Sequence, residues 1–341
     1  MIRVLIADDS ATVRSALAAM LSEDPELKIV GQAADGIEAV SLARSLRPDV
    51  ITMDVNMPGL DGLGATAAIM AEAPSRVLVI TSVKEHRQLE LGFKAMAAGA
   101  LELLAKPQGN AVEMRAWGRK VAEAVRLMAE VPVVRRQGVS APSVYTAAGI
   151  GGTVDVFALV ASTGGPPALA QVLSALPPDL PIPLLVAQHI AEGFAVGLVR
   201  WFGSVCGLRI LSAEDGTQPK PGTVYLPPDG RDLVVDHDGA LRIPLANSLH
   251  RPSGNLLLHS LAKWFGPRAG AAVLTGMGDD GAQGLLALRQ AGGATFAQDE
   301  ATSVVFGMPQ AALACGAVRS TLALQSVAPA ILTLCKRRRR G

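Results

Sequence analysis

Residues 156–166 read Val-Phe-Ala-Leu-Val-Ala-Ser-Thr-Gly-Gly-Pro, and this stretch decides how the second half of the chain folds. An apolar run too short for a helix ends at Ser162, and two glycines then lead into a helical pattern that begins at Pro166. The stretch therefore predicts a strand, a tight turn and a helix. Such a turn raises a side chain above the carboxyl edge of a sheet and leaves backbone N–H groups free to face it. Ser162 is thus a candidate nucleophile.

A simpler interpretation is that Ser162 caps the following helix, a role that serine fills in many proteins. The Gly-x-Ser-x-Gly pattern of a nucleophile elbow is also incomplete, because Val160 stands where the first glycine would be. The stretch taken alone favours the cap. The nucleophile hypothesis therefore depends on residues elsewhere in the chain.

Two further apolar runs, Pro183–Gln188 and Ala271–Thr275, also end in polar residues. His189 follows the first, and the pair Asp279–Asp280 follows the second. If the three strands lie parallel in one sheet, these residues meet Ser162 at its carboxyl edge, where open α/β sheets place their sites. Serine, histidine and aspartate are the nucleophile, the base and the carboxylate that acyl transfer needs. The shared strand ends raise the nucleophile hypothesis above the cap.

Two alternatives stay open in this half of the chain. Asp279, considered alone, is better explained as part of a capped helix start, because the glycine-rich segment 275–281 precedes a helical pattern. The N–H groups of that segment could also form an oxyanion hole. His250 is a second candidate base, since Arg251, Pro252 and Ser253 place it in a loop.

The first half of the chain alternates short apolar strands with helical patterns, which predicts a doubly wound parallel sheet with its site at the carboxyl ends of the strands. The predicted strands are Arg3–Ala7, Ile29–Ala33, Val50–Met53, Val77–Thr81 and Ala100–Leu104. The polar residues expected at that edge are Asp8, Asp9, Asp54, Thr81 and Lys106.

Three carboxylates that converge on one point repel one another unless a divalent cation or an ammonium group lies among them. Mg²⁺ is the natural cation for such a set of oxygen ligands. A carboxylate held beside that ion and a lysine can attack phosphorus, because both cations neutralise the transferring group. A single aspartate after a strand is more often a helix cap, but the five residues together weaken that interpretation.

Length, composition and charge set limits on the remaining possibilities. The 341 residues suffice for two domains, predicted at 1–130 and 153–341 with a glycine- and proline-rich linker at 131–152. A net charge of +1 indicates no specific nucleic-acid partner, and the basic run 336–340 is expected to be a solvated end. No apolar run has bilayer-spanning length and no secretory signal begins the chain, so we expect a cytoplasmic protein without membrane insertion. Its three cysteines form no Cys-x-x-Cys pair, which argues against a zinc site.

The motifs of the first half resemble those of response-regulator receiver domains, over about 125 residues. They are the Asp8–Asp9 pair, Asp54 within Met-Asp-Val-Asn-Met-Pro-Gly-Leu-Asp-Gly, Thr81, and Lys106–Pro107. The resemblance implies a flavodoxin-like fold in which a histidine kinase supplies a phosphoryl group to Asp54. It also implies that Asp9, Asp54 and the Asn56 backbone carbonyl bind Mg²⁺ with Asp8 behind them, and that Thr81 and Lys106 sense the phosphate. Leu103 stands where many receivers carry an aromatic switch residue.

The motifs of the second half are similar to those of the chemotaxis receptor protein-glutamate methylesterase family. They are Ala-Ser-Thr-Gly-Gly at 161–165, Gln-His-Ile at 188–190, Thr-Gly-Met-Gly-Asp-Asp-Gly-Ala at 275–282, and the segment 297–309. The resemblance implies a Rossmann-like α/β hydrolytic domain whose triad is Ser162, His189 and Asp280. It implies that Thr163 and the Met277 backbone hold the oxyanion, that the same site deamidates receptor glutamines, and that phosphorylation activates the enzyme. Its substrates would be methylated chemotaxis receptors, to whose clusters the enzyme is recruited.

The chain departs from that family pattern at two places. Ala191 replaces a common proline, and Gly254–Asn255 replaces a usual valine and aspartate. Neither departure is expected to contact the triad. Two rival functions remain: a receiver fused to a non-catalytic module that binds peptide or phosphate, and a DNA-binding regulator. The near-neutral charge and the lack of a helix-turn-helix pattern weigh against the second.

Overall fold

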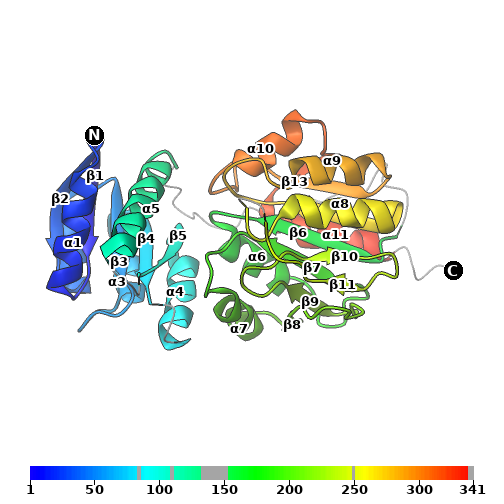
Figure 1. The fold of residues 1–341 in the computed structure, drawn as a ribbon, viewed down its shortest axis with the longest axis horizontal. Helices are drawn as coiled ribbons and strands as arrows, with labels where there is room; N and C mark the ends of the chain where they lie inside the picture. The colour runs from blue at the N-terminus through cyan, green and yellow to red at the C-terminus, as the bar shows by residue number, and fades with distance from the viewer. Residues whose placement is uncertain (83–85, 108–110, 132–152, 248–249, 337–341) are drawn as a thin grey trace. The chain divides into compact units, whose positions relative to one another are not determined.

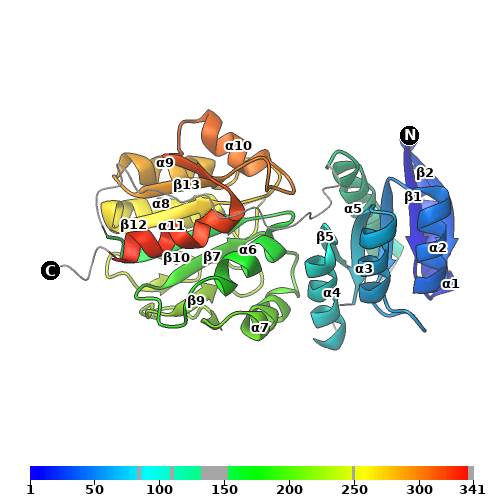
Figure 2. The same ribbon diagram turned by 180° about the vertical axis from the view of Figure 1, so that it is seen from behind.

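The computed structural model describes residues 1–82, 86–107, 111–131, 153–247 and 250–336. Contacts within the chain divide it into two compact units, Met1–Gln137 and Gly138–Gly341. Each unit has a parallel sheet with helices on both faces (Figures 1 and 2), as predicted for the fold class. The predicted linker, apart from Val131, and the basic run after Lys336 lie outside the described residues.

The first unit is a five-stranded sheet in the order β2-β1-β3-β4-β5, in which every pair of neighbours is parallel. Its strands are β1 (Ile2–Ala7), β2 (Leu27–Ala33), β3 (Val50–Asp54), β4 (Arg76–Thr81) and β5 (Glu102–Ala105). Its helices are α1 (Ala11–Ser22), α2 (Gly36–Leu46), α3 (Gly62–Glu72), α4 (His86–Ala98) and α5 (Ala111–Ala129). Helices α1 and α5 cover one face, and α2 and α3 cover the other (Figures 1 and 2).

This strand order confirms the flavodoxin-like topology, with the strand order reversing between β1 and β3. Strands β3 and β4 are buried along almost their whole length, which explains why they read as continuous apolar runs. Strand β5 begins two residues later than predicted. Ala100 belongs instead to the turn after α4, where Gly99 adopts a φ of +121° that other residues rarely reach.

The second unit is a seven-stranded parallel sheet in the order β14-β13-β12-β6-β7-β9-β8. Its strands are β6 (Val156–Ala161), β7 (Leu184–Gln188), β8 (Arg209–Ser212), β9 (Thr223–Leu226), β12 (Ala269–Val273), β13 (Ala294–Gln298) and β14 (Ser320–Leu322). A separate hairpin pairs β10 (Val234–Val235) with β11 (Leu241–Arg242). Its helices are α6 (Gly165–Ser174), α7 (Ala195–Val205), α8 (Gly254–Trp264), α9 (Ala282–Gln290), α10 (Gly307–Ala314), α11 (Leu324–Lys336) and the 3₁₀ helix Gly266–Arg268.

Helices α8, α9 and α10 cover one face of this sheet, and α6, α7 and α11 cover the other (Figures 1 and 2). From β6 the chain passes to β7 and then to the edge strand β8, returns to β9 between those two, and later crosses to β12 on the other side of β6. The point of reversal lies between β6 and β12, where open α/β sheets bind their ligands. Within the described parts of the chain, no helix is both long and apolar enough to cross a membrane.

Candidate functional site

Ser162 directly follows β6 at the point where the strand order reverses. Its backbone N–H donates to the Thr275 carbonyl at 3.0 Å. The N-cap of α6 is Gly164, with a φ of +73° and no side-chain cap, so the cap interpretation of Ser162 is wrong. The half-buried Ser162 hydroxyl makes no hydrogen bond to any other residue that the structure describes. It is therefore free to react.

His189 follows β7, the neighbour of β6, and its N–H donates to the Ala161 carbonyl at 2.9 Å. The His189 Nε2 lies 2.8 Å from Asp280 Oδ2. With Nε2 bound to the carboxylate, Nδ1 is the ring nitrogen left to accept a proton. No hydrogen bond joins the side chains of Ser162 and His189, both of which the structure describes; this contact often tightens only with substrate.

Asp280 is only 1% exposed and lies against the first turn of α8. Its carboxylate accepts hydrogen bonds from Gly254 N at 2.5 Å, Asn255 N at 3.0 Å and Ser253 Oγ at 3.3 Å. Burial alone would raise the pKa of Asp280, but hydrogen bonds from His189, Asn255 and Gly254 outweigh it and lower the pKa to about 2. The carboxylate is therefore ionised at neutral pH and suited to orient His189.

These contacts correct the expectation that Gly254 and Asn255 do not touch the triad residues. Both backbone N–H groups bind Asp280, because α8 begins at Gly254 and its positive end faces the carboxylate. A Cβ on Gly254 would lie 2.3 Å from Val160 Cγ1, so glycine is required beside this valine. The N-cap of α8 is Ser253, whose hydroxyl accepts from the Leu256 N–H, so residue type indicates where the helix starts but not that this start faces Asp280. The other departure, Ala191, is exposed.

Asp279, the neighbouring carboxylate, is exposed. The N-cap of α9 is Gly281 and has no side-chain cap, so Asp279 does not cap this helix as its alternative interpretation required. Of the two aspartates, only Asp280 contacts His189.

The two segments expected to hold an oxyanion lie side by side. Thr275 Oγ1 donates to the Thr163 carbonyl at 3.0 Å and accepts from Val305 N at 2.9 Å. A Cβ on Gly276 would lie 2.7 Å from Ser162 Cβ, which shows how closely the loop approaches the serine. Among described residues, none accepts a hydrogen bond from the Met277 N–H. That donor is available beside Ser162.

His250 also lies at this site, although it is not bound to Asp280. Its ring stacks on the His189 ring, with centroids 5.0 Å apart and planes at 15°. His250 also lies near the glycine-rich loop, since a Cβ on Gly278 would lie 3.7 Å from His250 Cε1. The sequence placed His250 in a loop but gave no signal for the stacking.

At the acidic edge of the first unit, Lys106 forms ion pairs with two aspartates. Lys106 Nζ lies 2.8 Å from Asp8 Oδ2 and 2.7 Å from Asp54 Oδ2, and both carboxylates are buried. Burial raises the pKa of Asp54 to about 6, although the Lys106 ammonium acts in the opposite direction. Burial would lower the pKa of Lys106, but Asp54 and Asp8 raise it, so the lysine stays charged.

The same edge suits a hard divalent cation. Carboxylate oxygens of Asp8, Asp9 and Asp54 lie within 4.8 Å of one another, and oxygen is the ligand that Mg²⁺ prefers. Asp8, predicted to stand behind the ligands, contributes an oxygen to the same group. The buried hydroxyl of Thr81 has no hydrogen-bond partner among the described residues, so it can serve a group placed at this edge. The donor set of carboxylate oxygens therefore fits Mg²⁺.

Comparisons with known proteins match each of the two units to a family. Residues 157–331 match the family model described as CheB methylesterase, and residues 4–116 match the response regulator receiver domain. The chain is 55% identical to protein-glutamate methylesterase/protein-glutamine glutaminase 3 of Myxococcus xanthus, over 98% of this chain and 94% of that one. The chain belongs to this methylesterase/glutaminase family. It is also 44% identical to protein-glutamate methylesterase/protein-glutamine glutaminase 3 of Anaeromyxobacter dehalogenans, over 96% of this chain and 97% of that one.

A solved structure resembles the second unit, the methylesterase unit of the family. The crystal structure of the Thermotoga maritima CheB methylesterase catalytic domain is 32% identical, with a TM-score of 0.51. It covers 53% of this chain and 99% of its own. The fold of the methylesterase unit is therefore one found in an isolated catalytic domain.

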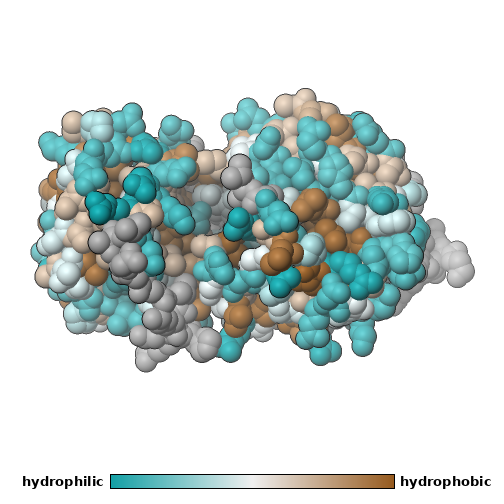
Figure 3. Space-filling model, in the orientation of Figure 1, coloured by the Kyte–Doolittle hydropathy of each residue, from teal (hydrophilic) through white to brown (hydrophobic). Residues whose placement is uncertain are grey.

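A pocket lies beside His189 in the methylesterase unit. Its lining is largely apolar with two exposed arginines, and consists of Gln188, Ile190, Ala195, Leu198, Leu226, Pro227, Pro228, Asp229, Gly230, Arg231, Arg251 and Pro252. Hydrophobic residues are also exposed on the face of this unit that α8 covers (Figure 3). The surroundings of the site thus offer both apolar surface and positive charge.

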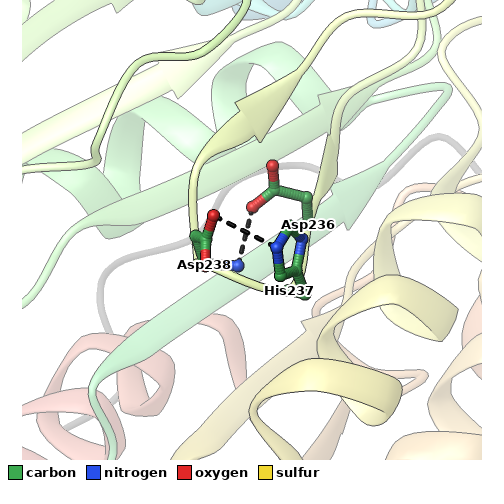
Figure 4. A group of neighbouring side chains, drawn as sticks. All are labelled: Asp236, His237 and Asp238. Atoms are coloured by element: carbon green, nitrogen blue, oxygen red, sulfur yellow. Dashed lines mark hydrogen bonds and ion pairs between the residues drawn. The ribbon is translucent and has the colours of Figure 1, made fainter.

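A second group of potential metal ligands, Asp236, His237 and Asp238, lies in the turn between β10 and β11 (Figure 4). Asp236 Oδ1 accepts from the N–H groups of Asp238 and Ala240, both at 3.0 Å, and Oδ2 pairs with Arg242 at 2.6 Å. His237 and Asp238 are exposed, and His237 Nε2 lies 3.2 Å from Asp238 Oδ2. The carboxylate of Asp236 is therefore committed to the turn.

Proposed function

We propose that this chain hydrolyses the methyl esters of glutamate side chains on chemotaxis receptors and deamidates receptor glutamines at the same site. The observation that carries the proposal is the 2.8 Å contact between His189 and Asp280, beside Ser162 at adjoining strand ends. A non-catalytic binding module has no need for a buried carboxylate that fixes a histidine next to an uncommitted serine hydroxyl. Membership of the methylesterase/glutaminase family supports the same activity.

In the proposed reaction, Ser162 Oγ attacks the ester carbonyl while His189 Nδ1 takes its proton. The negative charge that develops on the carbonyl oxygen is held by the Met277 N–H and by Thr163. His189 then returns the proton to the leaving methoxide, and methanol departs. Ionised Asp280 stabilises the imidazolium that forms between these steps.

Water clears the acyl-enzyme by the same route, with His189 as the base, and leaves a glutamate carboxylate. With a glutamine substrate the sequence is identical except that ammonia leaves in place of methanol. The apolar lining and the two arginines of the pocket beside His189 suit a segment that carries apolar and acidic side chains around the ester.

The receiver unit is proposed to control this reaction. Asp54 accepts a phosphoryl group from a histidine kinase, and Lys106 and Thr81 contact the phosphoryl oxygens. Mg²⁺ bound by Asp9, Asp54 and the Asn56 carbonyl would neutralise charge on the transferring group. The receiver (1–130), joined through the linker 131–152, hinders access of a receptor helix to the catalytic domain (153–341) until phosphorylation shifts the population toward an open arrangement. The site of action is the cytoplasm, at receptor clusters.

Methanol release from methylated receptor tests the proposal, with and without a phosphodonor. We expect release that rises with phosphodonor in the full chain, and a fragment 153–341 that is faster than the resting full chain and indifferent to phosphodonor. No methanol release by either protein would support the non-catalytic alternative. A fragment slower than the resting full chain would make the receiver an activator or a docking element.

A further inference from the structure

Gln188, the last residue of β7, joins the two reacting residues through one side-chain amide. It is 3% exposed, and its Nε2 donates to the Ser162 carbonyl at 2.9 Å and to the His189 carbonyl at 2.8 Å. Both partners are carbonyl oxygens, which only accept, so the orientation of the amide group is determined by its surroundings. The amide thus ties the residue after β6 to the residue after β7.

The turn after Ser162 is built to admit this amide. A Cβ on Gly165 would lie 2.0 Å from Gln188 Oε1 and 2.8 Å from Ala161 Cβ, so no residue with a side chain fits there without displacing the glutamine. The Gly165 N–H also donates to the Ser162 carbonyl, at 2.8 Å. The Ser162 carbonyl therefore has two donors, which use both of its lone pairs and hold this peptide in place.

One polar atom of the Gln188 side chain lowers the stability of the fold. Gln188 Oε1 is buried and has no hydrogen-bond partner among the described residues, and an unpaired buried acceptor is unfavourable. Methionine fills a similar volume without that acceptor. Filling space between the strands does not explain a glutamine here, whereas two donated bonds to Ser162 and His189 do.

We infer that Gln188 is a positioning residue of the ester hydrolysis. Resting on the proposed function, the inference is that the amide fixes the Ser162 main chain relative to that of His189. Gln188 also lines the pocket beside His189, but it is only 3% exposed and its amide NH₂ is bound to the Ser162 and His189 carbonyls, so it acts through these two residues rather than on the substrate. A displacement of about 1 Å between nucleophile and base can cost about 100-fold in rate, so a brace at this place has a large effect.

The test compares Gln188→Met with wild-type full-length protein on methylated receptor in the presence of phosphodonor. We expect kcat to fall about 10- to 100-fold with KM changed less than about threefold, because only the alignment of the reacting groups is lost. Labelling of Ser162 by a fluorophosphonate should slow by a similar factor. The pH midpoint of kcat should stay within about 0.3 units, since the His189–Asp280 contact remains intact.

Two further variants separate positioning from stability. Leu334→Ala removes a buried side chain of α11 in the same unit and should lower the melting temperature while leaving kcat near wild type. Gln188→Glu keeps the shape but replaces the donor NH₂ by an oxygen, so it should lose at least as much kcat as Gln188→Met. If Gln188→Met does not fold, Gln188→Glu and the labelling rate of its folded fraction provide the same comparison.

Wild-type kcat in either folded Gln188 variant would overturn the inference, as would an equal loss of kcat in Leu334→Ala. A shifted pH midpoint of kcat in Gln188→Met would also overturn the inference, because it would show that Gln188 affects the ionisation of the reacting groups rather than their position. Ser162→Ala is measured alongside. Full methanol release by Ser162→Ala would instead reject the proposed function itself, so the two failures are distinguishable.

Discussion

Each unit of the molecule carries a buried aspartate at the point where its strand order reverses, yet the pKa values of the two carboxyls shift in opposite directions. The pKa of Asp54 rises to about 6 and that of Asp280 falls to about 2, from the same ordinary value of 3.8. Burial disfavours the charged form of both. The difference lies in the donors. Asp280 receives hydrogen bonds from two backbone N–H groups, the Ser253 hydroxyl and His189. Asp54 receives one backbone hydrogen bond, at Asn56, and shares Lys106 with Asp8, whose negative charge raises the pKa of Asp54 further.

The contrast matches what each carboxylate is proposed to do. Asp280 must remain an anion throughout the reaction, and the first turn of α8 supplies permanent positive partial charge for that purpose. Asp54 must attack phosphorus, and a carboxylate already saturated with donors would be a poor nucleophile. Its missing positive charge is left for a divalent cation to provide. Asp280 is compensated by donors within the protein, whereas Asp54 lies in a cluster of carboxylates whose oxygens fit a divalent cation.

The largest expected effect is on catalysis. Asp280→Asn should lower the rate of ester hydrolysis on the order of 10³-fold or more, because His189 loses the charge that orients it and stabilises its protonated form. Asp279→Asn, the matched control at the exposed neighbour, should stay within about twofold of wild type. Methanol release measures both. The reverse ranking would place the orienting carboxylate at Asp279.

The next expected effect concerns phosphate. Asp54→Asn should not be labelled by a kinase or by a small phosphodonor, and its esterase rate should no longer respond to phosphodonor while the resting rate is kept. Chelation of Mg²⁺ should stop labelling of the wild type. Label that persists on Asp54→Asn would move the acceptor to another residue.

Stability should respond with opposite signs at the two sites. At pH 7 without Mg²⁺, Asp54→Asn should stabilise the receiver unit by up to about 3 kcal/mol, and Asp280→Asn should destabilise the methylesterase unit by about 2 kcal/mol or more. The folded-state pKa of Asp280 lies below its unfolded value, so its contribution is present above pH 4 and is lost as the pH falls toward 2. The folded-state pKa of Asp54 lies above its unfolded value, so the free-energy cost of ionising this buried carboxyl is fully present above about pH 6 and absent below about pH 4.

Hydrogen exchange resolved by unit measures these free energies separately. Equal destabilisation of both units would contradict the contrast between the two carboxylates. It would mean that hydrogen bonds and charges offset the burial of ionised Asp54 as fully as that of ionised Asp280.

The smallest expected effect is at Leu103. This residue is 7% exposed, and a Cβ on Gly92 would lie 2.9 Å from its Cδ1 and 3.7 Å from Thr81 Cγ2. Leu103 and Thr81 thus both lie against Gly92 of α4. Leu103→Ala should change the degree of activation by phosphodonor little, whereas Leu103→Tyr should change it measurably. A loss of activation in Leu103→Ala would show that the leucine itself transmits the signal.

The strand ends were the most predictable part of this protein. The polar residues that follow the predicted apolar runs lie at the carboxyl edge of each sheet, because parallel strands bring such positions together. The choice of Asp280 over Asp279 came from the family motif, and the contact with His189 agrees with it.

The features of the site that could not be predicted from the sequence are contacts between segments that lie far apart along the chain. Ser253 is an ordinary N-cap signal for the start of α8, but nothing in the sequence indicates that the N–H groups of Gly254 and Asn255 bind Asp280. The bracing amide of Gln188 and the stacking of His250 on His189 likewise arise only when separate loops meet. The strands β8, β9, β13 and β14 were not predicted, and most of them are only three or four residues long.

The central claim is that Ser162 is a nucleophile activated by His189 and Asp280, and trapping with a fluorophosphonate tests it most directly. Peptide mass spectrometry of the treated full-length protein should find one covalent adduct, on Ser162. The adduct should be absent from Ser162→Ala and should form far more slowly in His189→Ala and Asp280→Asn. An adduct on another residue, or labelling of Ser162 at an unchanged rate in both partner variants, would contradict the account.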